Sequence, residues 1–272
     1  MCIRDRYKVL LIKKDPLNMS LIEIIPCLSD NYAYLIRDEK TNKNILVDAP
    51  EHGPIETYLD KKAMSLDAIL ITHHHNDHID GINYLKIKYS PKVIGAKRDK
   101  HRLPPLDIEV EEGKELKIGS KTFEIYDVDG HTIGHIAYVL MEDKALFSGD
   151  SLMVMGCGRL FEGTQEDMWK SLKKLKQLPK DIMIYSGHEY TKSNIEFALS
   201  VDPQNEKLKA RRIRALDSLT KGIPTVPSKL EEELETNPFL RESETSILDN
   251  IDTEASDPVS RFAKIRALKD NF

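Results

Sequence analysis

The stretch "ITHHHNDHIDG" (residues 71–81) carries four histidines and two aspartates in eleven positions. It continues an apolar run, "AILIT" (68–72), that is typical of a buried strand, and a strand end is a stiff support for converging side chains. Alternate side chains of an extended chain point the same way. We therefore expect His73 and His75 to share one direction, and His74 to point the other way and take no part in a site.

The rest of the stretch adds a second pair of possible ligands. Asp77 and His78 follow where the chain is expected to turn into a helix. Imidazole and carboxylate groups together suit zinc, iron or manganese. The spacing H-x-H-x-D-H thus predicts a metal site, and further ligands must come from other parts of the chain.

Three other predicted strand ends place a glycine beside a possible ligand: His131 in "VDGHTIGH", Asp150 in "LFSGDS" and His188 in "YSGHEY". Each alone fits an ordinary surface residue, but together with H-x-H-x-D-H they indicate a site for two metal ions. The predicted ligands are His73, His75 and His131 for one ion, Asp77, His78 and His188 for the other, and Asp150 as a bridge. Two such ions can share a water and lower its pKa to roughly 7. Asp48 and His135 are predicted to support these ligands.

The region from Met19 to about His188 is predicted to consist of short strands with a few helices. The predicted strands are 22–25, 32–36, 44–47, 68–72, 92–96, 122–128, 136–141, 145–148 and 181–186. Thr164 and Asp167 form a capping signature before an apolar stripe, which predicts a helix there.

Helical patterns dominate after His188. The predicted helices are 192–201, 205–221, 228–235 and 257–270. Gly222 is expected to stop the second of these, and Ser228 with Glu231 to form a capping box for the third. We therefore predict a β-rich domain over 19–188 and an all-helical domain over 189–272.

The bulk composition excludes several classes of protein. A net charge of −5 over 272 residues argues against a nucleic-acid partner, and no run reaches the roughly 18 apolar residues that a membrane span needs. The three cysteines are widely spaced, which favours a reducing compartment and predicts a cytoplasmic protein. Residues 1–18 lack the clear strand pattern that begins at Met19. We therefore expect them to be a non-family extension that does not belong to the folded domains, and Met19 to be the natural start.

"THHHNDH" resembles the T-H-x-H-x-D-H signature of the metallo-β-lactamase superfamily, whose later ligands follow in the same order as here. The resemblance implies an α+β fold, the metallo-β-lactamase αβ/βα sandwich, in which two packed sheets have helices outside and metals at one edge. Several other segments resemble hydroxyacylglutathione hydrolase (glyoxalase II) over 19–272. They are "PCLSDNYAYLI" (26–36), "GCGRLFEGT" (156–164), "GHEYT" (187–191), "NPFLR" (237–241) and "RALKDNF" (266–272).

The resemblance implies hydrolysis of S-D-lactoylglutathione to D-lactate and glutathione, the second step of methylglyoxal detoxification. A metal-bridging hydroxide would attack the thioester, oriented by Asp77, with two zinc ions favoured and iron or manganese as alternatives. The partner is then a small glutathione thioester, with no nucleic acid and no membrane, and the protein is expected to be a monomer. The implied substrate-binding residues are Arg159, Phe161, Tyr190, Arg266 and Lys269.

Two departures from the family and one competing function remain open. Phe161 stands where many relatives have tyrosine, and Val128-Asp129 stands where Thr-Pro often precedes the Gly-His turn. The competing function is a persulfide dioxygenase-like oxidoreductase with one iron on the same scaffold. The helical C-terminal region with Arg266 and Lys269 favours the hydrolase.

Overall fold

The computed structural model describes residues 21–251 and 253–272, and its contacts divide the chain into two compact units. Unit 1 contains Ile136–Phe147 and the described part of Met1–Asp127, and unit 2 contains Val128–His135 and Ser148–Phe272.

The predicted extension over 1–18 and the predicted start at Met19 lie outside the described residues. The predicted domain boundary between residues 188 and 189 stays a prediction.

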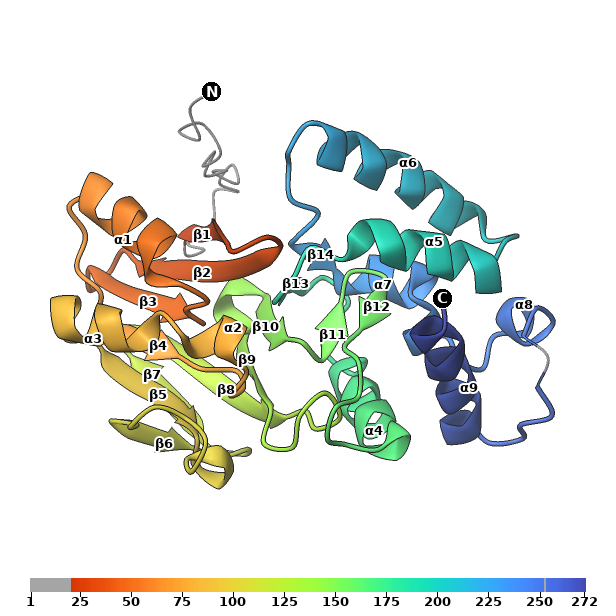
Figure 1. Ribbon diagram of the computed structural model, residues 1–272, viewed down its shortest axis with the longest axis horizontal. Helices are drawn as coiled ribbons and strands as arrows, with labels where there is room; N and C mark the ends of the chain where they lie inside the picture. Colours follow the sequence, from red (N-terminus) through yellow and green to blue (C-terminus); the bar gives the residue numbers. More distant parts are fainter. Residues whose placement is uncertain (1–20, 252) are drawn as a thin grey trace. The chain divides into compact units, whose positions relative to one another are not determined.

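Unit 1 contains a six-stranded sheet in the order β1-β2-β3-β4-β5-β6 (Figure 1). The first three strands pair antiparallel and the last four pair parallel. The strands are β1 (Leu21–Cys27), β2 (Asn31–Asp38), β3 (Lys43–Val47), β4 (Ala68–Leu70), β5 (Lys92–Ala96) and β6 (Ile108–Val110). Because parallel neighbours end at the same edge, the loops that follow β3 and β4 leave the sheet side by side.

Four further strands enter unit 1 as an antiparallel series in chain order. They are β7 (Glu115–Ile118), β8 (Lys121–Asp127), β9 (Ile136–Leu140) and β10 (Ala145–Gly149), the last of which continues into unit 2. The two layers meet through buried side chains, and the rings of Tyr34 and Phe147 lie 5.7 Å apart between their centroids. This packing agrees with the predicted sandwich of two sheets.

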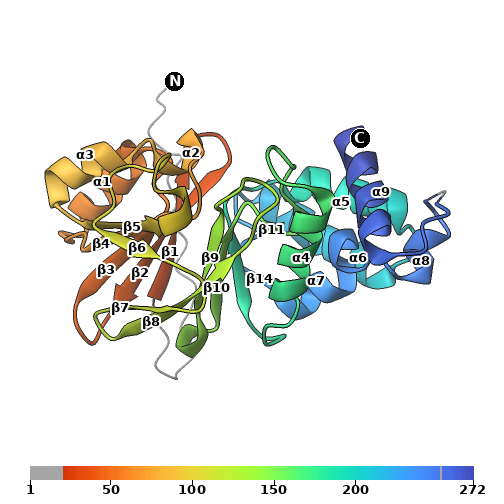
Figure 2. The same cartoon turned by 90° about the horizontal axis from the view of Figure 1, so that it is seen from below.

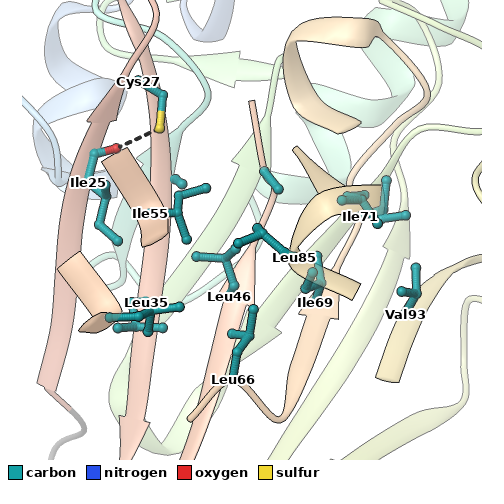
Figure 3. Packing of buried hydrophobic residues seen from close by; sticks show 14 of the residues in the cluster. Ile25, Cys27, Leu35, Leu46, Ile55, Leu66, Ile69, Ile71, Leu85 and Val93 are labelled. Atoms are coloured by element: carbon teal, nitrogen blue, oxygen red, sulfur yellow. Dashed lines mark hydrogen bonds between the residues drawn. The ribbon is translucent and has the colours of Figure 1, made fainter. Parts of the chain in front are cut away.

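Helices cover the other face of the six-stranded sheet (Figure 1). The helical elements of unit 1 are α1 (His52–Lys61), α2 (Asn76–Ile79), α3 (Ile82–Tyr89), η1 (Lys97–Asp99) and η2 (Met141–Asp143). Ile55 of α1 and Leu85 of α3 pack with strand residues such as Leu35, Leu46 and Ile69 (Figure 3). Each leucine-sized side chain so buried contributes about 1.5–3 kcal/mol, which anchors the strand that leads into the histidine motif.

Unit 2 is mainly helical (Figure 2). Its helices are α4 (Gln165–Leu175), α5 (Thr191–Val201), α6 (Glu206–Thr220), α7 (Leu230–Thr236), η3 (Pro238–Leu240), α8 (Thr245–Leu248) and α9 (Pro258–Asp270). Its strands are β11 (Leu152–Met153), β12 (Gly156–Cys157), β13 (Met183–Ser186) and β14 (Ser228–Lys229). In the part of the chain that the structure describes, no helix has both the length and the apolar character needed to cross a bilayer.

The predicted strands and helix ends that depend on a short local sequence pattern are confirmed, with one exception. All nine predicted strands occur, and Thr164 and Asp167 form a reciprocal capping box at the start of α4. Gly222 ends the α6 region with a φ of +67°, a conformation that glycine adopts without strain.

The capping box predicted at Ser228 and Glu231 is wrong. Ser228 belongs to the two-residue strand β14, and α7 begins after Lys229 without a side-chain cap. The Ser228 hydroxyl donates instead to the buried carboxylate of Glu233. A long-range contact therefore replaces the local one that the spacing suggested, and the C-terminal region is helical apart from this short strand.

Candidate metal centre

In unit 1, two imidazoles of the motif converge directly after β4. His73 is buried, and its Nε2 lies 3.1 Å from Nδ1 of His75. Nitrogen ligands at 2.0–2.1 Å from a tetrahedral zinc ion lie about 3.3 Å apart, so this spacing fits a shared ion. The Thr72 hydroxyl lies 3.0 Å from Nδ1 of His73 and fixes the ring so that Nε2 faces His75.

The Asp48 carboxylate holds both ends of the same loop. It accepts hydrogen bonds from the Thr72 backbone N–H and hydroxyl, each at 2.8 Å, and it lies 2.8 Å from Nδ1 of the fully buried His78. A carboxylate on one imidazole nitrogen directs the other nitrogen toward a metal. Asp48 occupies the left-handed region with a φ of 56°, which orients its side chain back toward β4. These contacts agree with its predicted supporting role.

Asp77 is held by Asn31, a buried residue at the start of β2. The Asn31 Nδ2 donates to the Asp77 backbone carbonyl at 3.0 Å and to its Oδ2 at 3.1 Å. Gly81 is the last residue of the motif and packs directly against the backbone of Glu51. A Cβ at this position would lie 2.7 Å from the Glu51 carbonyl carbon, so no larger residue fits there. Neither Asn31 nor Gly81 was predicted to take part in the site, although they belong to the segments "PCLSDNYAYLI" and "ITHHHNDHIDG", respectively.

His74 lies beside a different partner. Its Nδ1 is 3.2 Å from Oδ2 of the buried Asp99. Asp99 is also paired with Arg102 at 2.6 Å. His74 is therefore engaged away from the Nε2 of His73, in agreement with the alternation that excluded it.

In unit 2, two histidines meet at one carboxylate oxygen. Oδ2 of Asp150 lies 3.4 Å from Nε2 of His131 and 3.2 Å from Nε2 of His188. All three residues are about 4 % exposed. One oxygen between two imidazoles is the arrangement expected of a carboxylate that bridges two ions.

The segment "GCGRLFEGT" is folded around the His131 loop. The Arg159 backbone carbonyl lies 2.7 Å from Nδ1 of His131, which leaves Nε2 facing Asp150. The Phe161 backbone N–H donates to the His131 carbonyl at 3.1 Å. Gly158 must be glycine, because a Cβ there would overlap the Asp150 carbonyl and lie 2.9 Å from His131 Nδ1. This segment was predicted only from its resemblance to the family, and no local pattern indicates that it shapes the loop around His131.

The loop around His131 has two further supports. The Asp150 backbone N–H donates to Nε2 of His135 at 3.1 Å, which agrees with the predicted supporting role of His135. The Asp129 carboxylate accepts the Gly134 backbone N–H at 2.7 Å. Asp129, which departs from the family pattern, therefore closes the same turn.

Two of the predicted substrate residues present aromatic rings beside histidines that are predicted to bind metal. Phe161 is 62 % exposed, and its ring lies edge-on to His131 with centroids 5.2 Å apart. Tyr190 is 41 % exposed and stacks on His188 at 4.7 Å. The Arg159 side chain is mostly exposed, and its Nε lies 3.5 Å from Asp270. These three side chains are available to a ligand.

The two cations of α9 that are predicted to bind substrate differ in accessibility. Arg266 is 5 % exposed, and it binds the Cys157 carbonyl at 3.1 Å and Asp270 at 2.9 Å. Lys269 is half-buried and donates to the Ser193 carbonyl at 3.0 Å. Burial lowers the pKa of Lys269, and the nearby Arg266 guanidinium lowers it further. Lys269 is therefore the more accessible of the two cations.

The two described cysteines are unsuited to catalysis. Cys27 and Cys157 are free and buried. Burial raises the pKa of the Cys157 thiol to about 11 and that of Cys27 to about 12. Because the thiolate is the reactive form, neither is available as a nucleophile near neutral pH.

The chain matches two family models that together cover nearly all its described length. Residues 29–188 match the metallo-β-lactamase superfamily, and residues 189–272 match the hydroxyacylglutathione hydrolase C-terminus. A protein named hydroxyacylglutathione hydrolase from Ruegeria pomeroyi is 53% identical over 251 residues, which are 92% of this chain and 98% of that protein. One of the same name from a Jannaschia species is 48% identical over 248 residues, 91% of this chain and 97% of that protein.

Solved structures show the same fold at lower identity. The B3 metallo-β-lactamase BLEG-1 has a TM-score of 0.63 at 22% identity, over 81% of this chain and 99% of that chain. ETHE1 from Myxococcus xanthus has a TM-score of 0.62 at 24% identity, over 90% of this chain and 99% of that chain. These likenesses show the fold alone, whereas the sequence relatives match at higher identity over more than nine-tenths of this chain. The chain belongs to the hydroxyacylglutathione hydrolase family of the metallo-β-lactamase superfamily.

Proposed function

We propose that the chain hydrolyses S-D-lactoylglutathione and related 2-hydroxyacyl thioesters of glutathione to the free acid and glutathione. The observation that carries this proposal is the position of the Asp150 carboxylate oxygen, which lies within 3.4 Å of both His131 and His188. The predicted ligand sets assign these two histidines to different ions. A shared oxygen between them supports a binuclear centre, which we propose as the place of the hydrolysis.

The proposed ligands are the seven that the sequence indicates. They are His73, His75 and His131 for one ion, Asp77, His78 and His188 for the second, and Asp150 for both. Divalent ions bound there would supply an activated water near neutral pH and polarise the thioester carbonyl. We infer zinc, with iron or manganese as alternatives, because the set mixes imidazole and carboxylate.

The chain's own groups have distinct tasks in this reaction. Asp48 and Thr72 keep the imidazoles of His78 and His73 in the orientation that ligation requires. We propose that the Asp77 carboxylate, steadied by Asn31, accepts a hydrogen bond from the attacking water and so directs it at the carbonyl carbon. The leaving thiolate has a solution pKa near 8.5, so no strong general acid is required.

We propose that glutathione binds along the surface of unit 2 that carries Arg159, Phe161 and Tyr190. Exposed rings and a cation suit a peptide with two carboxylates. Lys269 would add a second cation. The buried Arg266 would not contact glutathione directly; it would contribute its positive charge and keep the Cys157 carbonyl in place by a hydrogen bond. Phe161 in place of tyrosine would remove one hydroxyl from this surface.

The compartment and assembly state are also proposals. Free, buried Cys27 and Cys157 support a reducing compartment, and we propose a cytoplasmic monomer.

The proposal is tested by incubating the metal-loaded protein with S-D-lactoylglutathione and following the loss of thioester absorbance. We expect hydrolysis, and we expect Asp150→Asn to lose both activity and at least one equivalent of metal. Oxygen uptake with glutathione persulfide, measured on the same sample, tests the dioxygenase alternative. Oxygen uptake without thioester hydrolysis would overturn the proposal.

A further inference from the structure

A short hairpin connects the helices of unit 2 with the loop around His131. It consists of β11 and β12, in which Leu152 pairs with Cys157 and Met153 with Gly156. Its turn includes Met155, whose φ of 51° is a left-handed conformation that a non-glycine residue adopts only when its surroundings hold it. Most of the contacts that hold this turn come from α7 and the residue that follows it, and one comes from Asn194 of α5.

Glu233 of α7 binds the turn directly. Its side chain is fully buried, and Oε2 accepts the Met155 backbone N–H at 2.8 Å. The same oxygen accepts Nδ2 of Asn237 at 3.1 Å. Nδ2 of Asn237 in turn donates to the carbonyls of Met153 at 3.2 Å and Gly156 at 3.0 Å. One carboxylate oxygen and the Asn237 amide thus hold three backbone groups of the turn, and Asn194 of α5 holds a fourth by donating to the Val154 carbonyl at 3.0 Å.

The second oxygen of Glu233 is held by donors as well. Oε1 accepts hydrogen bonds from the guanidinium of Arg211 on α6 and from the hydroxyl of Ser228 on β14. Arg211 is 4 % exposed, so this ion pair is buried. Both oxygens of Glu233 therefore face donors only, a surrounding that suits a carboxylate and disfavours an amide.

Gly158 and Arg159, the two residues that follow the hairpin, connect it to the His131 loop. The Gly158 backbone N–H donates to the Ser151 carbonyl at 3.2 Å, and the following Arg159 carbonyl lies 2.7 Å from Nδ1 of His131. Gly158 also lies against the Asp150 backbone, where no side chain fits. A shift of the hairpin would therefore move the carbonyl that orients the His131 ring.

We propose that Glu233 is a positioning residue for the metal centre, which acts on His131 and Asp150 through the hairpin of residues 152–157. This inference rests on the proposed function, since it assigns Glu233 a part in that site. The groups that orient a ligand imidazole typically change metal affinity or activity by about 10- to 100-fold when they are removed. Glu233 acts one step further away, through the Arg159 carbonyl, and we expect an effect of about tenfold.

Glu233→Gln is the variant of choice because it keeps the volume and turns one oxygen into a donor. Glu235→Gln is the matched control: Glu235 lies on the same helix, and its side chain pairs with Lys207 at the surface. Hydrogen exchange of the metal-free proteins should show faster exchange at Met155 in Glu233→Gln only. Metal affinity and kcat should each fall about tenfold, while KM for the thioester should stay within about twofold.

A second variant separates positioning from a general loss of stability. In Arg211→Met/Glu233→Gln the guanidinium is gone, so the glutamine can turn its oxygen toward Met155 and its amide toward Ser228. We expect protection at Met155 and metal affinity to return to within about threefold of the wild type. If Glu233→Gln does not fold, the double variant alone provides the test.

Two results would overturn the inference. One is a folded Glu233→Gln protein whose exchange at Met155 and metal affinity equal those of Glu235→Gln. The other is a folded double variant that does not recover. A wild type that binds metal but does not hydrolyse the thioester would contradict the proposed function instead, because the exchange and affinity comparisons do not depend on that activity.

Discussion

The two units supply their ligands in different ways. In unit 1, four proposed ligands lie within His73–His78, directly after β4, and their orientation depends on neighbours such as Asp48 and Thr72. In unit 2, three proposed ligands come from three distant turns, and a loop from a fourth segment packs against two of them, His131 and Asp150. A contiguous motif is therefore positioned mainly by one strand end, whereas a dispersed set depends on long-range packing.

The largest expected effect tests the alternation in unit 1. His75→Ala removes a ligand, so we expect kcat to fall more than about 100-fold, beyond the loss typical of supporting residues, together with bound metal. His74→Ala is the matched control, since His74 lies beside Asp99. Its kcat and metal content should stay near those of the wild type. Similar losses in the two variants, measured by steady-state kinetics and metal analysis, would contradict the alternation.

The next effect tests the packing in unit 2. Gly158→Ala adds a Cβ against the Asp150 carbonyl and His131, so the loop must move. We expect overpacking to cost about 1–3 kcal/mol of unfolding free energy and to weaken metal binding as well. Gly53→Ala is the control, because no described heavy atom lies within 4 Å of its added Cβ. Denaturant unfolding and metal titration measure both effects, and a neutral Gly158→Ala would remove the packing argument.

Asp48→Asn tests whether the Asp48 carboxylate supports the imidazoles of unit 1. The amide can keep one hydrogen bond from Thr72 but places a donor or a weaker acceptor beside Nδ1 of His78. We expect metal affinity to fall about 10- to 100-fold, with the main loss in one of two binding steps. Calorimetric titration of the metal-free protein resolves the steps; equal weakening of both would contradict a role centred on His78 and would show that the contact through Thr72 to His73 matters as much.

The smallest effect concerns Lys269. Because its pKa is lowered, Lys269 loses its charge at a lower pH than an ordinary lysine, and binding of an anionic substrate should weaken as pH rises. KM should therefore increase with pH in the wild type. Lys269→Gln should raise KM about two- to fivefold at neutral pH and remove most of this dependence. An unchanged KM profile in Lys269→Gln would exclude Lys269 from the binding surface.

The sequence predicted best those features that a short pattern encodes. The strand "AILIT", the alternation at His73 to His75 and the capping box of α4 each depend on residues a few positions apart, and each occurs as expected. The place of Asp48 at a strand end predicted a supporting role for it, and its contacts with Thr72 and His78 are compatible with that prediction.

Features that depend on distant partners were not predictable in this way. Ser228 has the spacing of a helix cap, yet its hydroxyl donates to Glu233. That carboxylate is buried in an ion pair with Arg211, which is distant in sequence. Gly158 carries no local signal of its role, since the constraint comes from the Asp150 backbone. Arg266 is identified as a cation by sequence, but only its contacts with Cys157 and Asp270 reveal that it is buried.

The most direct test of the central claim is a metal titration of the metal-free protein, with S-D-lactoylglutathione hydrolysis measured at each addition. The two proposed ligand sets, which have Asp150 in common, predict that activity rises until two equivalents are bound. Full activity at one equivalent, or no hydrolysis with two equivalents bound, would contradict a binuclear thioester hydrolase.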